Sequence, residues 1–203
     1  MNCPSYIEEM KTKIDFRKLY DLNVRDFIFL YQGVLNDGRG LKKLIDAFKQ
    51  VSNLTDSAKL VILGDGVLRN KLQNKVKILK MEKTVFFHDF VSYNELIQYT
   101  MGADFGINLL EAFNLSKKLA SPNKMFEYIQ AEIPVLSSFS PENDLLLRDH
   151  KIGIQCENTV EDISKGIMNL CNQKKVFHNQ DFKEAKNKYC WENQEAKLFD
   201  IVK

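Results

Sequence analysis

The sequence has few cysteines and histidines, and none of them are spaced to bind a metal. Its four cysteines lie far apart and form no Cys-x-x-Cys pair, and its three histidines are scattered. Structural zinc sites and disulfide-stapled folds both need regular spacing of such residues. We therefore expect no metal site, no cofactor, no disulfide framework and a reducing, cytoplasmic compartment.

An excess of charge of one sign is also absent. The chain carries 29 Lys and Arg against 27 Asp and Glu, a formal net charge of +2, and the lysines are spread along its length. Domains that bind nucleic acids usually concentrate basic residues on one surface. We therefore expect no nucleic-acid partner, and a solvated surface accounts for most of the lysines.

Long apolar runs are missing too. No run approaches the roughly 18 residues that a membrane-spanning helix needs, and the N-terminal sequence MNCPSYIEEMKTK has no apolar signal core. Linkers rich in Gly, Pro or Ser and internal repeats are absent as well. We expect no membrane span and one main domain at 23–175. A lead-in segment at 1–22 precedes this domain, and C-terminal helices at 176–203 pack on it.

Short apolar runs alternate with helical patterns along the chain. FIFLY (27–31) is a near-continuous apolar run, as in a strand covered on both faces, and the segment after it has apolar residues at helical spacing. The pattern repeats six times with connections too long for hairpins, which predicts an α/β fold with a doubly wound, parallel, six-stranded Rossmann-like sheet. The expected strands are 27–31, 59–64, 84–90, 103–110, 133–138 and 151–157. The expected helices are 41–51, 68–79, 92–101, 122–131, 142–148 and 160–170, the last of them capped by Asn158 or Thr159. The remaining C-terminal segment is expected to be helical and to dock through Trp191, Leu198, Phe199 and Val202.

Ligands of such sheets bind beyond the carboxyl ends of the strands, and two loops there carry cations. QGVLNDGRG (32–40) has three glycines, which allow close approach of a ligand to the backbone, and Arg39 near the start of the next helix. SPNK (121–124) begins another helix. Its serine can cap, its proline suits the first turn, and the free N–H groups favour an anion. Lys124 adds a positive charge in that turn, so the two cations together indicate a diphosphate site.

Each of these residues also has a simpler interpretation. A lysine at a helix start is usually solvated, and Glu127, which could accept hydrogen bonds from sugar hydroxyls, could be a surface acid. The GDG sequence (64–66) is a turn more often than a site, and GDGVLR has Arg69 where a dinucleotide-binding fingerprint needs its third glycine. His88 is expected to be a partly buried residue at the end of a strand.

Five segments of the chain carry a family resemblance. They are YQGVLNDGRGLKKLIDAF, LVILGDGVLRNKL, VFFHDFVSYNELIQYTMGADFGINLL, SPNKMFEYIQAEIPVLSS and NKYCWENQEAKLFDIV. Together they resemble the C-terminal, donor-binding half of a GT-B glycosyltransferase of the group 1, family 4 class. The order and spacing match over about 25–140, and the last segment resembles the helix that closes that half.

The resemblance implies a role for each matching residue and none for a catalytic nucleophile. Those implied to bind the donor diphosphate are Gly33, Arg39, Ser121, Pro122, Asn123 and Lys124. Glu127 is implied to bind the ribose, and Gly64, Gly66, Phe90 and Val91 are implied to lie near the nucleobase. The donor would be a nucleoside-diphosphate sugar such as a UDP-sugar, and transfer would retain the anomeric configuration without a metal. Polysaccharide or glycoconjugate synthesis is the usual work of the family.

The sequence departs from the family pattern in three ways. Val34 stands where an arginine often follows the first glycine, and Leu119 stands where the first of two paired glutamates is expected, a position that Glu111 cannot simply replace. The resemblance also implies an acceptor-binding N-terminal half that this sequence does not include, so we expect the chain to be a fragment or one subunit of a split enzyme, inactive alone. The acceptor, a sugar or a lipid-linked glycan, and any peripheral membrane contact would involve that missing half. A sugar-nucleotide epimerase half and a non-catalytic nucleotide-binding module remain alternatives.

Overall fold

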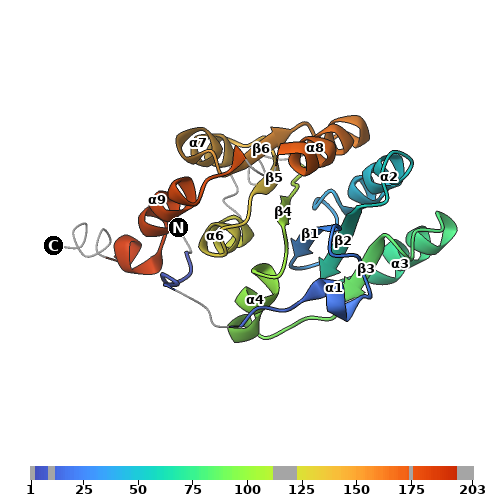
Figure 1. Ribbon diagram of the computed structural model, residues 1–203, viewed down its shortest axis with the longest axis horizontal. Coiled ribbons are helices and arrows are strands. Elements are labelled where there is room, and N and C mark those ends of the chain that lie inside the picture. Colours follow the sequence, from blue (N-terminus) through green and yellow to red (C-terminus); the bar gives the residue numbers. More distant parts are fainter. Residues whose placement is uncertain (1–2, 9–11, 112–122, 174–175, 196–203) are drawn as a thin grey trace.

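A single parallel sheet forms the centre of the molecule. The computed structural model describes residues 3–8, 12–111, 123–173 and 176–195. Six parallel strands lie in the order β3-β2-β1-β4-β5-β6 (Figure 1), which confirms the doubly wound α/β sheet that the alternating pattern predicted. The strands are β1 (Phe27–Gln32), β2 (Ala58–Leu63), β3 (Val85–His88), β4 (Phe105–Asn108), β5 (Val135–Ser138) and β6 (Gly153–Cys156).

Helices cover both faces of this sheet. In Figure 1, α2, α3 and α8 lie on one face, and α4, α6, α7 and α9 lie on the other with the short α1. Two buried apolar clusters match these two layers. The described helices are α1 (Phe16–Leu19), α2 (Leu41–Ser52), α3 (Arg69–Ile78), α4 (Tyr93–Thr100), α6 (Asn123–Gln130), α7 (Pro141–His150), α8 (Val160–Gln173) and α9 (Asn179–Lys188).

The first strand shows why an uninterrupted apolar run is needed here. Successive side chains of a strand point to opposite faces of its sheet. Phe29 and Tyr31 pack in the cluster under α2 and α8, whereas Ile28 and Leu30 pack in the cluster on the other face, and all four are fully buried. Each of these side chains contributes roughly 2 kcal/mol through burial.

Local capping fixes several helix starts. The hydroxyl and the N–H of Ser92 both donate to the carboxylate of Glu95, in the capping box that the sequence predicted for α4, and these bonds, the hydroxyl's first, lower the pKa of Glu95. Of the two candidate caps before α8, Thr159 is the one used, because its hydroxyl accepts from the Asp162 N–H at 3.2 Å. The caps place the helix starts beyond the carboxyl ends of the strands.

The C-terminal segment packs on the helix layer through residues that the sequence analysis did not name. Phe182 and Ala185 of α9, and Tyr189 just after it, are buried, and α9 packs against α6 and α7. Trp191 keeps 37% of its surface exposed, and its backbone N–H donates to the carbonyl of Pro4 at 2.8 Å. Leu198, Phe199 and Val202 lie outside the described residues. The proposed boundaries at 22 and 175 stay predictions.

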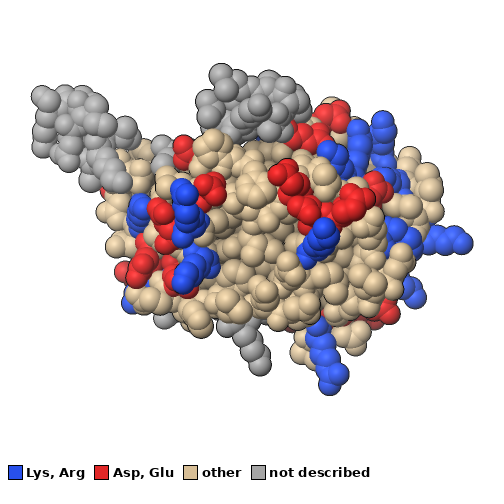
Figure 2. Space-filling model, turned by 90° about the horizontal axis from the view of Figure 1, so that it is seen from above, with Lys and Arg blue, Asp and Glu red and all other residues tan. Residues whose placement is uncertain are grey.

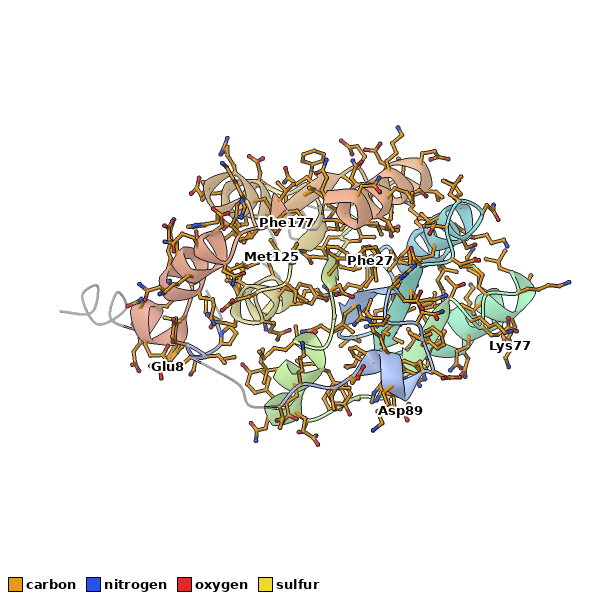
Figure 3. The ribbon with its side chains drawn as sticks, in the orientation of Figure 1. Glu8, Phe27, Lys77, Asp89, Met125 and Phe177 are labelled. Carbon is orange, nitrogen blue, oxygen red and sulfur yellow. The ribbon has the colours of Figure 1, made fainter. Side chains whose placement is uncertain are left out.

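The surface agrees with the balanced charge of the sequence. Figure 2 shows basic and acidic side chains next to one another in the left and central charged groups of the face it displays. In Figure 3, Lys77 lies on the outer side of α3, whereas the fully buried Met125 lies between α6 and the sheet. Among the described residues, no helix is long and apolar enough to cross a bilayer.

Candidate functional site

Three loops meet beyond the carboxyl ends of β1, β2 and β4. The Gly33 N–H donates to the carbonyl of Leu63 at 3.0 Å, and the Glu111 N–H donates to the carbonyl of Gly38 at 3.0 Å. These contacts tie the loop after β1 to the ends of β2 and β4. The neighbours β1 and β4 mark the point at which strand order reverses, which is where open α/β sheets bind ligands.

Two glycines of the GDG sequence are required by packing between these loops. Gly64 has φ +138°, and a Cβ there would lie 2.1 Å from the carbonyl oxygen of Gly33. At Gly66 a Cβ would lie 2.7 Å from the backbone of Leu35. Both glycines therefore have a structural role, and their expected position near a nucleobase stays a prediction.

Lys124, in the first turn of α6, is a buried amine without a hydrogen-bond partner among the described residues. Its Nζ lies 3.8 Å from the centroid of the Tyr31 ring, a cation–π contact. The same atom is 3.9 Å from where a Cβ on Gly33 would lie. The loop after β1 and the start of α6, 91 residues apart in sequence (124 − 33), thus come together as the sequence predicted.

Burial and a like charge lower the pKa of this lysine. The pKa of Lys124 falls from 10.5 to about 7, first because burial disfavours the ammonium form and then because of the charge of Arg39, with Glu127 acting in the opposite direction. Arg39 is half-buried just before Gly40, the residue that caps α2 with φ +66°. Burial raises the pKa of Tyr31 to about 12 and the charge of Arg39 opposes this shift. A bound anion would favour the charged form of Lys124 and offset the like charge of Arg39.

Of the remaining residues expected at the diphosphate, the structure describes only Asn123. Asn123 is the first residue of α6 and is exposed. Ser121 and Pro122 lie outside the described residues, as does Leu119. Their assignments, with those of Gly33, Arg39 and Lys124, stay predictions.

Glu127 lies one turn further along α6 and is half-buried. Its Oε2 accepts a hydrogen bond of 2.5 Å from Nε2 of Gln32, the last residue of β1. Burial raises the pKa of Glu127, while this hydrogen bond and the charge of Lys124 oppose the shift. Gln32 was missed by the sequence analysis, although a polar residue that ends an otherwise apolar strand was the available signal.

A pocket of about 200 Å³ adjoins Glu127. Its walls come from α4, from α6 and from the N-terminal segment 3–8. The lining residues are Pro4, Ser5, Ile7, Tyr93, Asn94, Leu96, Ile97, Thr100 and Glu127. The surface of the pocket is mainly apolar, with the carboxylate of Glu127 as its charged group.

The residues expected near a nucleobase lie at the ends of β2 and β3 and do not line this pocket. Phe90 follows β3 and is 76% exposed, whereas Val91 is half-buried against the helix layer. His88 is half-buried at the end of β3, as expected, with its ring against the edge of Tyr99. The nucleobase assignment of Phe90 and Val91 stays a prediction.

Other candidate groups in this region have ordinary partners. The carboxylate of Glu111 pairs with Lys43 at 3.3 Å. Within the described ranges, no three His, Cys, Asp or Glu side chains are gathered as they would be around a metal ion.

Comparison with known proteins decides the family. The model of the family "Glycosyl transferases group 1" matches residues 12–189. The chain belongs to that family. It is 42% identical over 60 residues to an uncharacterized glycosyltransferase, MJ1059, of Methanocaldococcus jannaschii, a match that covers 30% of this chain and 15% of that protein.

Solved structures of glycosyltransferases share its fold. Sucrose-phosphate synthase from Thermosynechococcus elongatus aligns over 98% of this chain and 51% of its own, with a TM-score of 0.74 and 16% identity. Anabaena HepE in complex with UDP aligns over 92% of this chain and 51% of its own, with a TM-score of 0.73 and 14% identity. The C-terminal domain of the group 1 glycosyl transferase LpcC from Francisella tularensis aligns over 89% of this chain and 96% of its own, with a TM-score of 0.69 and 14% identity.

The extent of these matches defines which part of a GT-B protein the chain represents. The chain spans about half the length of sucrose-phosphate synthase and HepE, and nearly all of the LpcC domain. This chain therefore has the fold of the C-terminal half of a GT-B glycosyltransferase, as the resemblance implied.

Proposed function

We propose that this chain is the donor-binding half of a glycosyltransferase that uses a nucleoside-diphosphate sugar. The observation that carries the proposal is Lys124, whose buried amine has no hydrogen-bond partner among the described residues and is acted on by the like charge of Arg39. Such an arrangement is unfavourable in the free protein and is relieved when an anion binds between the cations. The family membership and the complex of HepE with UDP support the same conclusion.

The proposed chemistry is electrostatic stabilisation of the leaving diphosphate. When the bond between sugar and diphosphate breaks, negative charge grows on the diphosphate oxygens. Arg39, Lys124 and the N–H groups at the start of α6 are fixed before the reaction and stabilise that charge without further rearrangement. We propose that transfer is metal-independent and retains the anomeric configuration. We propose that the acceptor binds to a second domain outside this sequence.

Glu127 would hold the ribose of the donor. Its carboxylate adjoins the pocket, and one oxygen already accepts from Gln32, which leaves lone pairs on the other oxygen for sugar hydroxyls. The neighbouring apolar surface from α4 would cover the nucleoside. Polysaccharide or glycoconjugate synthesis is the proposed context.

Titration calorimetry with UDP, GDP and ADP tests the proposal. We expect one of them to bind, and Arg39→Ala and Glu127→Ala each to weaken that binding by about 10- to 100-fold, because each removes hydrogen bonds made with a charged group. Arg148→Ala, in the exposed last turn of α7, is the matched control and should leave the affinity unchanged. No heat from any of the three at millimolar protein and ligand would overturn the proposal.

A further inference from the structure

A buried amide connects the proposed ribose-binding carboxylate to a second helix. The side chain of Gln32 is 1% exposed and lies between α4 and α6. Its Nε2 donates to Oε2 of Glu127 at 2.5 Å, and its Oε1 accepts from the hydroxyl of Thr100 at 2.9 Å. Thr100 is fully buried and, like Glu127, lines the 200 Å³ pocket. Gln32 thus lies behind two residues of the pocket wall.

The chemistry of these groups allows only one orientation of the amide. An ionised carboxylate can only accept hydrogen bonds, so the NH₂ end of Gln32 must face Glu127. The reverse orientation would place two acceptor oxygens 2.5 Å apart. The carbonyl end then faces Thr100, whose hydroxyl hydrogen is shared with the carbonyl of Leu96 at 2.8 Å. The direction of donation is therefore from Thr100 to Gln32 and from Gln32 to Glu127.

This direction has a consequence for the carboxylate. The side chain of Glu127 projects from α6 and has several rotatable bonds, and burial disfavours its charged form. A charge-assisted hydrogen bond from a fixed donor both restricts these rotations and favours the acceptor-only form. Oε2 is engaged by Gln32, and Oε1 is left to accept from a ligand.

We propose that Gln32 is a positioning residue that holds Glu127 so that the carboxylate accepts from the vicinal hydroxyls of a ribose. This inference rests on the proposed function, since it names how the same site distinguishes its ligand. Gln32 touches no ligand in this account and acts through Glu127. Its loss should therefore reduce discrimination between a ribonucleotide and the matching 2′-deoxyribonucleotide more than it reduces affinity for diphosphate in general.

The test measures affinity for a nucleoside diphosphate and its 2′-deoxy form by calorimetry, with UDP and 2′-deoxy-UDP as probes, or the GDP or ADP pair if one of those binds tighter. The wild-type chain should bind the ribonucleotide about 10-fold or more tightly, as expected for a hydrogen bond to a charged group. Gln32→Met keeps the length and removes the donor, and should reduce that ratio to about 3-fold or less. Thr100→Val, which removes only the hydroxyl anchoring the amide, should give an intermediate ratio.

Gln130→Met is the matched control. Gln130 is also 1% exposed and donates to the carbonyl of Lys186 from the same helix as Glu127, without contacting that carboxylate. Both Gln130→Met and Gln32→Met should lower the melting temperature, but Gln130→Met should leave the ribose preference intact. An unchanged ratio of ribonucleotide to deoxyribonucleotide affinity in Gln32→Met, or in Thr100→Val if the first variant does not fold, would overturn this inference but not the proposed function. Absence of nucleotide binding to the wild-type chain would overturn the proposed function as well.

Discussion

Replacing Lys124 with methionine is expected to weaken nucleoside diphosphate binding by about 100-fold while making the free protein more stable. The weaker binding follows because a buried ammonium paired with a phosphate is a strong charge-assisted contact. The greater stability follows because the same amine is buried with no hydrogen-bond partner among the described residues in the free protein. Methionine retains the aliphatic length and the contact with the Tyr31 ring without the charge.

The stability difference should depend on pH in a defined direction. The pKa of Lys124 is about 7 when folded and has its ordinary value of 10.5 when unfolded. Between these values the unfolded chain binds more protons, so the contribution of the lysine to the free energy of unfolding rises with pH. The advantage of Lys124→Met should be largest at pH 6 and shrink above pH 7 by up to about 1.4 kcal/mol per pH unit.

Urea unfolding at several pH values and calorimetry with the best-binding diphosphate check both expectations. Because only the ammonium form pairs with an anion, binding to the wild type above pH 7 should take up a proton, visible as different heats in buffers of different ionisation enthalpy. This uptake should vanish in Lys124→Met. Equal affinity of wild type and variant would show that the amine does not contact the ligand.

Replacing Gly64 with alanine is expected to lower the free energy of unfolding by about 3–5 kcal/mol, combining an unfavourable backbone conformation with overpacking. The added Cβ would lie 2.1 Å from the backbone oxygen of Gly33, and neither loop can move without breaking the bond between the Gly33 N–H and Leu63. Chemical denaturation followed by circular dichroism measures the loss.

Gly33→Ala separates the two contributions. Gly33 also has a positive φ, +122°, but a Cβ there would meet only the end of the Lys124 side chain, at 3.9 Å. The free energy of unfolding of Gly33→Ala should therefore fall by only about 1–2 kcal/mol, the cost of the left-handed conformation. Equal losses for the two alanine variants would mean that the packing between the two loops does not restrict Gly64.

The sheet was predictable because its central strands are buried on both faces. Residues 27–31 of β1 are all apolar, and such runs separated by helical patterns admit few arrangements. The predicted ends of the strands were less accurate. Residues 133 and 134 were expected in β5, but the strand begins at Val135, since Pro134 cannot donate a ladder hydrogen bond.

The identity of the charged residues in the candidate site was predictable from the sequence, but their burial and protonation were not. Lys124 and Arg39 stand out in sequence because cations at helix starts are locally unfavourable. That Lys124 lies over Tyr31, loses solvent and has its pKa lowered depends on contacts between distant segments. The hydrogen bond between Gln32 and Glu127 spans 95 positions, and no local pattern indicates it.

A backbone amide NMR titration of the chain with UDP, GDP or ADP tests the central claim most directly. The account predicts that the largest saturable shifts fall on Gly33, Lys124 and Glu127, because the diphosphate would lie between the loop after β1 and the start of α6. Saturable shifts confined to other surfaces, or none with any of the three at millimolar concentration, would contradict it.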